Sequence, residues 1–435
     1  MKRMFAMLLA VGWGAGAQAA DLLGIYREAT TADARYASAR LQREAGQEKV
    51  VQARAGLLPS LTASAGTTYS SVDATQPLVR EYGYNTNSYS LQLTQPLFRA
   101  QNWVAYEQGK LGTELADLQF VAAEMDLIVR TTQAYFDLLG AQDVLTTVTR
   151  LKTAAGEQLQ LSKKSFEVGT VTVTDVNDAQ SRYDIAAAQE IAAQNDVNVK
   201  REALRVLTGK EPPQLAGLRT GVMLAQPQPA VVDSWAQAAQ DGNLDVQAQQ
   251  LNTSIAEREV ARVRAAHLPT VDAVASYGRS HATNGSSGNP SEGKTWSVGV
   301  QASLPLYQGG GTQSKVRESR ALSDKAREDL ETARRAAAQS ARQSFLGVTS
   351  GIAQVKGYEA AVLSSRSALE SNRLGYQVGV KINMDVLNAQ TQLAQTEQQL
   401  AKARYDTIMA QVKLKQAVGT LSLKDLEEIN ALLER

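Results

Sequence analysis

The chain carries one structural unit twice, and this internal repeat constrains the fold more than any other feature. Phe166-Glu167-Val168-Gly169 recurs as Tyr376-Gln377-Val378-Gly379, and Arg54-Ala55 recurs as Arg264-Ala265, each 210 residues later. Prolines, glycines and aspartates keep this offset along nearly the whole chain, which a chance similarity of two helical segments would not do. The fold must therefore contain two copies of one supersecondary unit.

The repeat also sets the expected domain boundaries. Residues 20–210 form the first copy, residues 234–420 form the second, and residues 421–435 remain as a C-terminal segment. Residues 211–233 read as a linker because they hold four prolines, which interrupt regular structure. These prolines are Pro212, Pro213, Pro227 and Pro229.

The first 19 residues predict a secretory signal peptide. Lys2 and Arg3 supply the positive start, residues 4–16 the apolar run, and Ala17-Gln18-Ala19 the small-x-small cleavage signal. The alternative is an N-terminal membrane helix, but such a helix needs about 20 apolar residues. We expect the Sec pathway to remove this leader, so that the mature chain starts near Ala20.

Composition argues against an enzyme and against a nucleic-acid partner. The 45 basic and 44 acidic side chains give a net charge of +1, which offers no electrostatic footprint for nucleic acid. Cysteine is absent and histidine occurs only at His267 and His281, so no metal site is expected. Gly309-Gly310-Gly311 superficially suits phosphate binding but lacks the following Lys-Ser/Thr. We predict no catalytic residue, cofactor or metal.

Each copy contains two segments in which apolar and small polar residues alternate. Trp296, Val298 and Val300, for example, alternate with Ser297 and Gly299. Such alternation is typical of a transmembrane barrel with lipid outside and water inside, and equally of a soluble antiparallel sheet with one buried face. The strands are expected at about 57–71, 88–97, 268–278 and 295–306, with polar loops at 73–87 and 279–294.

Long helical stretches follow the strands. The long helices are expected at about 101–168 and 312–378, and the return helices at about 172–208 and 382–418. Residues 101–168 number 68, or about 100 Å of helix. Residues 21–55 and 172–208 together number nearly the same, so two shorter helices end to end match one long helix. The second copy repeats this arrangement with helices expected over 233–266 and 382–418.

The return helix of the second copy carries a heptad pattern. Val386, Leu393 and Leu400 recur every seven residues, which predicts supercoiling against a neighbouring helix. An ordinary helical bundle core explains this pattern equally well, but it leaves the amphipathic strands unexplained. Four strands are too few to close a membrane barrel, so several chains must share one. Two chains give eight strands and three give twelve, and the residues alone do not choose.

The most specific segments resemble one known family. These segments are Asp21-Leu22-Leu23-Gly24-Ile25-Tyr26, Leu91-Gln92-Leu93-Thr94-Gln95, Leu304-Pro305-Leu306-Tyr307-Gln308-Gly309-Gly310, residues 376–390, Ala403-Arg404-Tyr405 and Gly419-Thr420-Leu421. Together with the duplication, they resemble the TolC family of outer-membrane efflux and type I secretion proteins. The similarity covers nearly the whole mature chain.

This resemblance implies a mainly α-helical fold with a contribution to a transmembrane β-barrel. It implies a homotrimer with a twelve-stranded barrel in outer-membrane lipid and a twelve-helix tunnel through the periplasm of a Gram-negative bacterium. Residues 211–233 and 421–435 would contribute to a girdle around that tunnel. A periplasmic adaptor (membrane fusion protein) and an inner-membrane ABC or RND transporter would be the partners. Small molecules, proteins or both would leave through the lumen.

The resemblance also implies a gate at the periplasmic mouth. Tyr376 and Lys381 correspond to positions that tie the inner helix pair to its neighbour, with Asp175 as the acidic partner. The family usually has arginine where this chain has Lys381, and lysine lacks the bidentate fork. Asp385 would form a threefold acidic ring, and Asn388 occupies the position of the second ring.

A local role is the alternative for both aspartates. Asp175 and Asp385 lie in the first turn of a return helix, where the helix dipole favours a carboxylate. Thr172 or Thr174 would cap the first of these helices, and Asn383 the second.

The turns between long and return helices are the expected adaptor-docking tips. Gly169 and Gly379 suit the positive φ of a tight turn. The docking residues implied by the resemblance are Val168, Gly169, Thr170, Val378, Gly379 and Val380. A competing interpretation is that the chain is itself a periplasmic coiled-coil adaptor, but one hairpin would suffice for that function.

Overall fold

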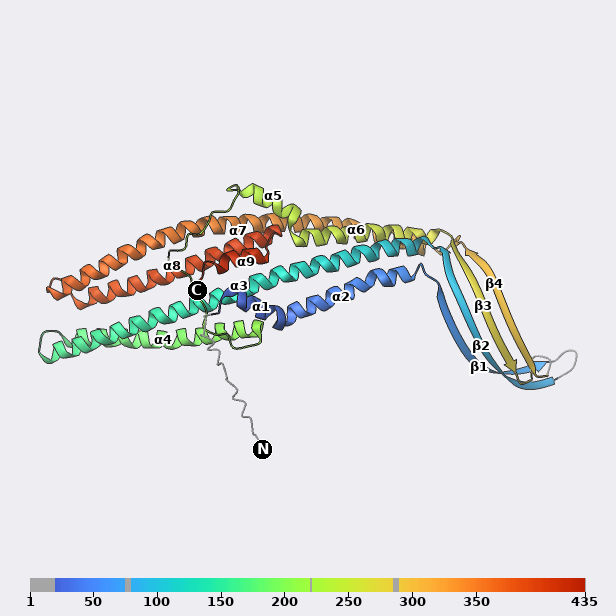
Figure 1. Ribbon diagram of the computed structural model, residues 1–435, viewed down its shortest axis with the longest axis horizontal. Helices are drawn as coiled ribbons and strands as arrows, with labels where there is room; N and C mark the ends of the chain where they lie inside the picture. Colours follow the sequence, from blue (N-terminus) through green and yellow to red (C-terminus); the bar gives the residue numbers. More distant parts are fainter. Residues whose placement is uncertain (1–19, 75–79, 220, 285–288, 435) are drawn as a thin grey trace, which may run out of the picture. The chain divides into compact units, whose positions relative to one another are not determined.

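The computed structural model describes residues 20–74, 80–219, 221–284 and 289–434, so the predicted signal peptide at 1–19 lies outside it. The duplication is visible in the order of elements, since each copy runs through two short helices, two strands, a long helix and a return helix (Figure 1). In chain order these are α1 (Leu22–Ala32), α2 (Ala34–Ala55), β1 (Ser60–Ala74), β2 (Arg80–Phe98), α3 (Ala100–Glu167), α4 (Val173–Thr208), α5 (Val232–Gly242), α6 (Leu244–Arg264), the 3₁₀ turn η1 (Ala265–His267), β3 (Thr270–Ala282), β4 (Ser291–Ser303), α7 (Gly311–Gln377), α8 (Asn383–Val418) and α9 (Leu423–Asn430).

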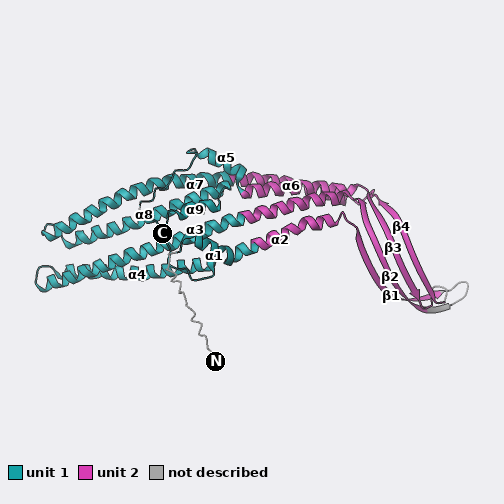
Figure 2. Ribbon diagram, viewed as in Figure 1, with its two compact units in different colours: residues 1–38, 122–243, 336–435 teal, residues 39–121, 244–335 magenta. Residues whose placement is uncertain are grey.

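The chain divides into two compact units (Figure 2). Unit 1 comprises residues 1–38, 122–243 and 336–435, and so contains α1, α4, α5, α8, α9 and the C-terminal parts of α3 and α7. Unit 2 comprises residues 39–121 and 244–335, and contains the four strands, most of α2, α6 and the N-terminal parts of α3 and α7.

Unit 2 is built on one antiparallel sheet in the order β1-β2-β3-β4. The copies meet at the β2–β3 pair, where Leu91 lies opposite Tyr277 and Leu93 opposite Ala275. A register shift at Pro96 and Phe98 interrupts this ladder, as expected where proline lacks an N–H donor. β1 and β4 are the two edges of the sheet, so each offers a row of backbone groups to a further strand.

The strands extend further into the predicted loops than the sequence predicts, whereas at their helix ends β1, β3 and β4 stop two or three residues short of the predicted bounds. β1 continues to Ala74 and β2 begins at Arg80, within the segment expected to be a loop at 73–87. β3 and β4 similarly continue into the expected loop at 279–294. Polar residues are compatible with these strands because cross-strand contacts satisfy them, such as the ion pair of Arg279 with Glu292.

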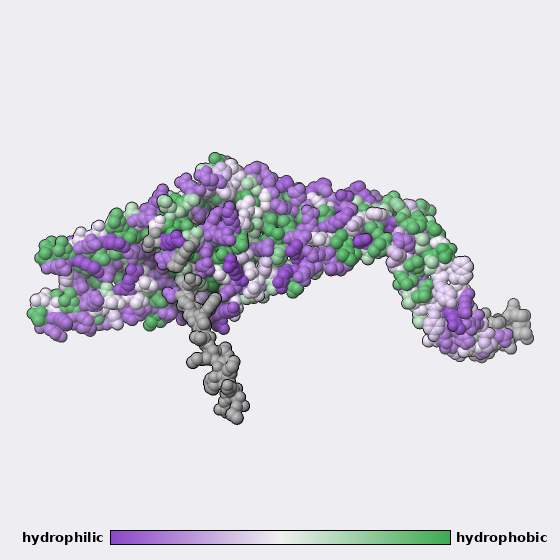
Figure 3. All heavy atoms as spheres, viewed as in Figure 1, coloured by the Kyte–Doolittle hydropathy of each residue, from purple (hydrophilic) through white to green (hydrophobic). Residues whose placement is uncertain are grey.

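One face of the sheet is apolar and open. Val298 and Val300 are 75% and 68% exposed, although their alternation with Ser297 and Gly299 is that of a strand with a buried side. Figure 3 shows hydrophobic residues over the end of the sheet nearest α3 and hydrophilic residues at the far end. A sheet of this kind needs a lipid or protein cover over its apolar face.

The two short helices of each copy meet at a sharp break, so the continuous helices expected over 21–55 and 233–266 are wrong. The break falls at Asp33 in the first copy and at Asn243 in the second, which occupy matching positions of the repeat. Asp33 leaves the helical conformation and its carboxylate accepts the backbone N–H of Tyr36, starting α2. Asp and Asn are more favourable at the start of a helix than in its interior. The periodicity of apolar residues in the sequence does not reveal such a break.

An ion pair holds the first break in place. Arg130 on α3 donates to both carboxylate oxygens of Asp33, at 2.8 and 3.1 Å, and Asp33 is only 5% exposed. These hydrogen bonds from the guanidinium lower the pKa of Asp33 against the opposing effect of burial. In the second copy the amide of Asn243 instead donates to the carbonyl oxygen of Ala417, at 2.9 Å.

The linker and both ends of the described chain gather on unit 1. Tyr135 of α3 is fully buried, and its hydroxyl donates to the carbonyl oxygens of Ala216 and Ala20 at 2.8 and 3.1 Å. Leu218 of the linker pairs with Leu433 in an antiparallel bridge that follows α9. The linker and the C-terminal segment are therefore packed parts of unit 1.

Candidate functional site

The predicted tips are tight turns with glycine in the left-handed conformation. Gly169 has φ 77° and Gly379 has φ 76°, and the same bonds close both turns. The Gly169 N–H donates to Phe166 O at 2.9 Å, and the Gly379 N–H donates to Tyr376 O at 3.1 Å. A Cβ at either glycine would meet nothing within 4 Å, so backbone conformation alone requires glycine there.

Exposed valines surround these glycines. Val168, Val378 and Val380 are 66–78% exposed, and Thr170 is also exposed. Apolar side chains presented at the end of a helical hairpin form a surface suited to protein contact.

Asp175 has the local role of a helix cap. It forms a capping box with Thr172, whose N–H and hydroxyl each donate to Asp175 Oδ2 at 2.8 Å. Of the two candidate caps, the structure uses Thr172 and not Thr174. The hydrogen bonds from the backbone and side chain of Thr172 lower the pKa of Asp175.

The start of α8 differs from the start of α4. Its N-cap is Ile382, which makes no side-chain cap, so the predicted capping by Asn383 is wrong. Asn383 is already the first helical residue, and its amide instead donates to Ser162 Oγ on α3 at 3.2 Å. Lys381 Nζ lies 3.6 Å from Asp385 Oδ2.

Within one chain the structure does not bring Lys381 to Asp175, the pair predicted to tie the gate. Lys381, in the turn before α8, contacts Asp385 in the first turn of that helix, and Asp175 is engaged by Thr172. A tie between Lys381 and Asp175 must therefore compete with these local contacts if it forms between neighbouring chains. An exposed pair of this kind contributes about 0.2–1 kcal/mol.

Arg182 of α4 is a further residue of this region, which the sequence does not predict. Its Nη2 lies 2.9 Å from Asn388 Oδ1 and 2.8 Å from Met384 Sδ, so one arginine holds the first turns of α8 against α4. The amide of Asn388 is thus already a hydrogen-bond partner. Nothing in the local sequence distinguishes Arg182 from other arginines on exposed helix faces, because its partner lies 206 residues away.

A second junction joins α8 to α3 further along unit 1. The Tyr405 hydroxyl donates to Asp143 Oδ2 at 2.6 Å, and the Tyr405 ring stacks on Phe136 with centroids 5.3 Å apart. The same ring lies over Gly140, where an added Cβ would be in ordinary contact with it at 3.7 Å. Burial raises the pKa of Asp143, and the hydrogen bond from Tyr405 opposes that rise.

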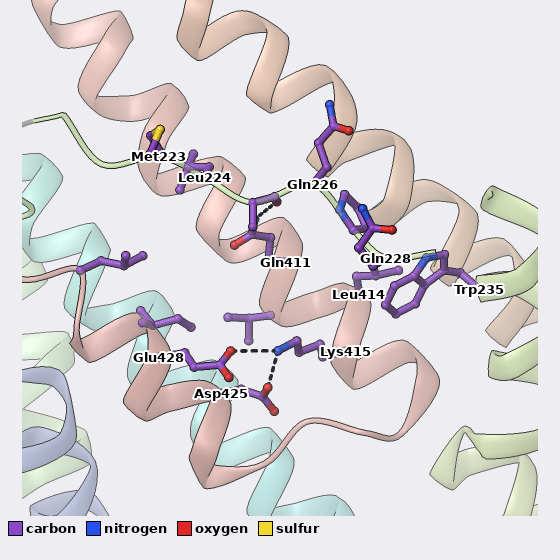
Figure 4. A pocket seen from close by; sticks show the side chains of 15 residues that line it. Met223, Leu224, Gln226, Gln228, Trp235, Gln411, Leu414, Lys415, Asp425 and Glu428 are labelled. Carbon is purple, nitrogen blue, oxygen red and sulfur yellow. Dashed lines mark hydrogen bonds and ion pairs between the residues drawn. The ribbon is translucent and has the colours of Figure 1, made fainter. Parts of the chain in front are cut away.

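A cavity of about 330 Å³ lies between the linker, α8 and α9 (Figure 4). Leu224, Trp235 and Leu414 supply apolar walls. Lys415 forms ion pairs with Asp425 and with Glu428 at its edge. One ammonium group between two carboxylates leaves a single net negative charge at this edge of the cavity.

The described residues contain no group of three or more His, Cys, Asp or Glu side chains that could hold a metal ion. Among the helices of the described ranges, none is long and apolar enough to span a membrane.

The duplicated unit with its two strands and helical hairpin is a family feature. The sequence model described as "Outer membrane efflux protein" matches residues 25–210 and 235–420, one match for each copy. The chain belongs to the outer membrane efflux protein family. The resemblance stated from the sequence is thereby confirmed.

Individual members of the outer membrane efflux protein family agree with this assignment. Outer membrane protein TolC of Vibrio cholerae is 33% identical over 439 residues, covering 100% of this chain and 99% of the relative. Alkaline protease secretion protein AprF of Pseudomonas aeruginosa is 32% identical over 420 residues, covering 95% and 87%. The crystal structure of the Campylobacter jejuni CmeC outer membrane channel superposes with a TM-score of 0.81 at 18% identity, covering 100% and 98%.

These relatives confirm the predicted fold, location and general function. The protein has the fold of outer-membrane channels, and it is an outer-membrane exit channel for efflux and type I secretion. The known relatives are channels and not enzymes, and they work in export systems that include partner proteins.

Proposed function

We propose that three copies of this chain enclose one continuous export duct. A single chain supplies a four-stranded sheet with two edges and an exposed apolar face. Unpaired backbone groups are too costly in lipid, so the edges must pair with strands of other chains. Three chains give twelve strands and a water-filled lumen, whereas two give eight and a lumen filled by side chains. This sheet is the single observation that carries the proposal.

The helices of unit 1 support assembly from several chains. α4 exposes a second apolar stripe with seven-residue spacing, about 100° around the helix from its buried seam. The stripe consists of Ile185, Ala192, Val199 and Val206, and the buried seam includes Ala179, Ala186 and Ala193. A helix with two such seams needs a second helical neighbour. We assign the exposed stripe to contact with the α7–α8 hairpin of the adjacent copy.

Charge placed on the stripe tests the assembly. Val199→Asp should shift the detergent-solubilised protein from trimer to smaller species, measured by native mass spectrometry. Gln194→Asp adds the same charge at an exposed site on another side of α4 and should leave the trimer intact. A wild-type protein that is monomeric in detergent and makes no pores in planar bilayers would overturn the proposal.

The periplasmic mouth of this duct is proposed to lie at the two hairpin tips. Tyr376 and Lys381 would contact Asp175 of a neighbouring chain in the closed state, and Asp385 would narrow the pore as a threefold ring. The Asp385 side chain, which is 37% exposed and lies 3.6 Å from Lys381, supports this role. Asn388 adds no charge to the ring and is held by Arg182.

The exposed valines at the tips are proposed to dock a periplasmic adaptor, which connects the duct to an inner-membrane ABC or RND transporter. Cargo would be small molecules, proteins or both. Cysteines introduced at Thr170 and Val380 should form cross-links to one periplasmic protein in intact cells. Cysteine at Glu202, exposed on α4 away from the tips, is the matched control. Cross-linking that is equal at all three positions would contradict docking at the tips.

A further inference from the structure

The apolar face of the sheet ends in a row of positive charge. Strand register places Leu91, Tyr277 and Trp296 side by side across β2, β3 and β4. Two residues further from the helices, the same register places Arg279 between Tyr89 and Lys294. Residues two apart along a strand share a face, so these charges lie on the same face as the aromatic row.

That face is the one we assign to lipid. Toward the helices it continues as Leu93, Ala275 and Val298. The opposite face carries small hydroxyl side chains bonded to one another, with the Ser276 and Ser297 hydroxyls 2.8 Å apart. An apolar band bordered by aromatic residues is typical of the outer surface of a membrane barrel, and a small polar face is typical of its lumen.

The charged row lies at the level of the lipid headgroups of the outer leaflet. Within β4 this band runs from Trp296 to Ser303, and the exposed Leu304 follows the end of the strand, so the apolar band is about as long as a tilted strand that crosses the hydrocarbon core. Lys294 lies two residues beyond this band, about 7 Å along the strand. β2 passes directly into α3 at the other end of the band, so the charged row belongs to the side of the membrane away from the helices.

The geometry of the row favours an anion. Arg279 and Lys294 are direct cross-strand partners, and like charges in such positions destabilise a sheet unless an anion lies between them. Glu292 accepts from Nε and Nη2 of Arg279, at 2.8 and 2.5 Å, which fixes the plane of the guanidinium. Among the residues that the structure describes, Nη1 of Arg279 and Nζ of Lys294 have no hydrogen-bond partner, and both side chains are exposed. Together with Glu292 they leave one net positive charge per chain.

We propose that Arg279 and Lys294 bind a phosphate group of the phosphorylated glycolipid of the outer leaflet, lipid A. Guanidinium and ammonium groups form short, charge-assisted hydrogen bonds to phosphate oxygens. Tyr277 and Trp296 in the adjacent row contact the acyl chains below that phosphate. The site rests on the proposed function in one respect, the assignment of the apolar face to lipid.

Native mass spectrometry of the full mature protein with added lipid A tests this site. Lipid A should bind, and the double variant Arg279→Gln, Lys294→Gln should raise its apparent Kd about tenfold or more, as expected for lost hydrogen bonds to a charged group. The control Lys325→Gln, Arg335→Gln removes one lysine and one arginine from exposed ion pairs on α7. This control should leave the Kd unchanged.

Two further ligands identify what is recognised. Dephosphorylated lipid A should bind wild type and the double variant equally, and weakly. Inorganic phosphate should not displace lipid A at equal concentration. Equal lipid A affinity of wild type and the double variant would overturn the proposal, as would displacement by inorganic phosphate. The same spectra report the number of chains in each complex, so failure of the lipid site is distinguishable from failure of the trimer.

Discussion

Removing the hydroxyl of Tyr405 should destabilise unit 1 in a manner that depends on pH. In Tyr405→Phe the ring keeps its stack on Phe136 and its place over Gly140, but Asp143 loses the hydrogen bond of 2.6 Å. A hydrogen bond to a charged group contributes about 1.5–3 kcal/mol, and Asp143 lies in a partly buried position where water replaces the donor poorly. We therefore expect Tyr405→Phe to lower the free energy of unfolding by about 1.5–3 kcal/mol per chain at neutral pH.

The pH dependence follows from the pKa of Asp143. Burial raises this pKa and the Tyr405 hydroxyl lowers it, so the variant should have a higher pKa than the wild type. When the folded-state pKa of a carboxyl lies above its unfolded-state pKa, the group stabilises the fold most below about pH 4. This contribution to the free energy of unfolding is lost as the pH rises through the folded-state pKa. The loss in free energy of unfolding caused by Tyr405→Phe should therefore be small near pH 4 and reach its largest value near pH 8.

Apparent melting temperatures of the detergent-solubilised protein at both pH values provide the measurement. Tyr183→Phe is the matched control, because the Tyr183 ring also packs over a glycine, Gly156, while its hydroxyl makes no hydrogen bond within the described residues. Asp143→Asn removes the charge, so Tyr405→Phe in that background should cost less and show no dependence on pH. An equal penalty at pH 4 and pH 8 would refute this reasoning.

Three further outcomes test the gate and the packing of unit 1. Tyr376→Phe combined with Lys381→Ala should raise the conductance of single pores in planar bilayers, and unchanged closed-state conductance would remove both residues from the gate. Asp385→Ala should reduce block of the pore by multivalent cations, whereas equal block would place the acidic constriction elsewhere. Gly419→Ala should destabilise by several kcal/mol, since φ is 76° and a Cβ would overlap the carbonyl oxygen of the residue that ends α5. The control is Gly357→Ala, in the interior of α7, where an added Cβ would meet nothing within 4 Å. This control should leave the free energy of unfolding unchanged or raise it by up to about 1 kcal/mol, as measured by thermal unfolding.

Much of the architecture follows from local patterns in the sequence. The 210-residue offset is visible because both copies keep prolines and glycines that only certain backbone conformations accept. The turns at Gly169 and Gly379 and the starts of α4 and α8 lie within two residues of their predicted places for the same reason. Strand ends are less well predicted, because polar residues such as Arg279 remain in a ladder when a partner across the strand satisfies them.

In the candidate site, too, the local contacts follow from the sequence and the long-range contacts do not. The capping of α4 by Thr172 and Asp175 is local, and the sequence contains the whole of it. The hydrogen bond from Arg182 to Asn388 joins residues 206 positions apart, and no periodicity in the sequence predicts it. Lys381 was expected to meet Asp175, but within the chain it meets Asp385 one helical turn away.

The sequence by itself determined the duplication, the order of helices and strands, the glycine turns and the membership of an outer-membrane channel family. Tertiary structure decided the breaks at Asp33 and Asn243, the junction of Tyr405 with Asp143 and the row of Arg279 beside Lys294. The physical reason is the range of the interactions involved. Backbone conformation and amphipathic periodicity act over a few residues and are written in neighbouring positions, whereas strand register and buried polar contacts depend on partners that only the folded chain brings within reach.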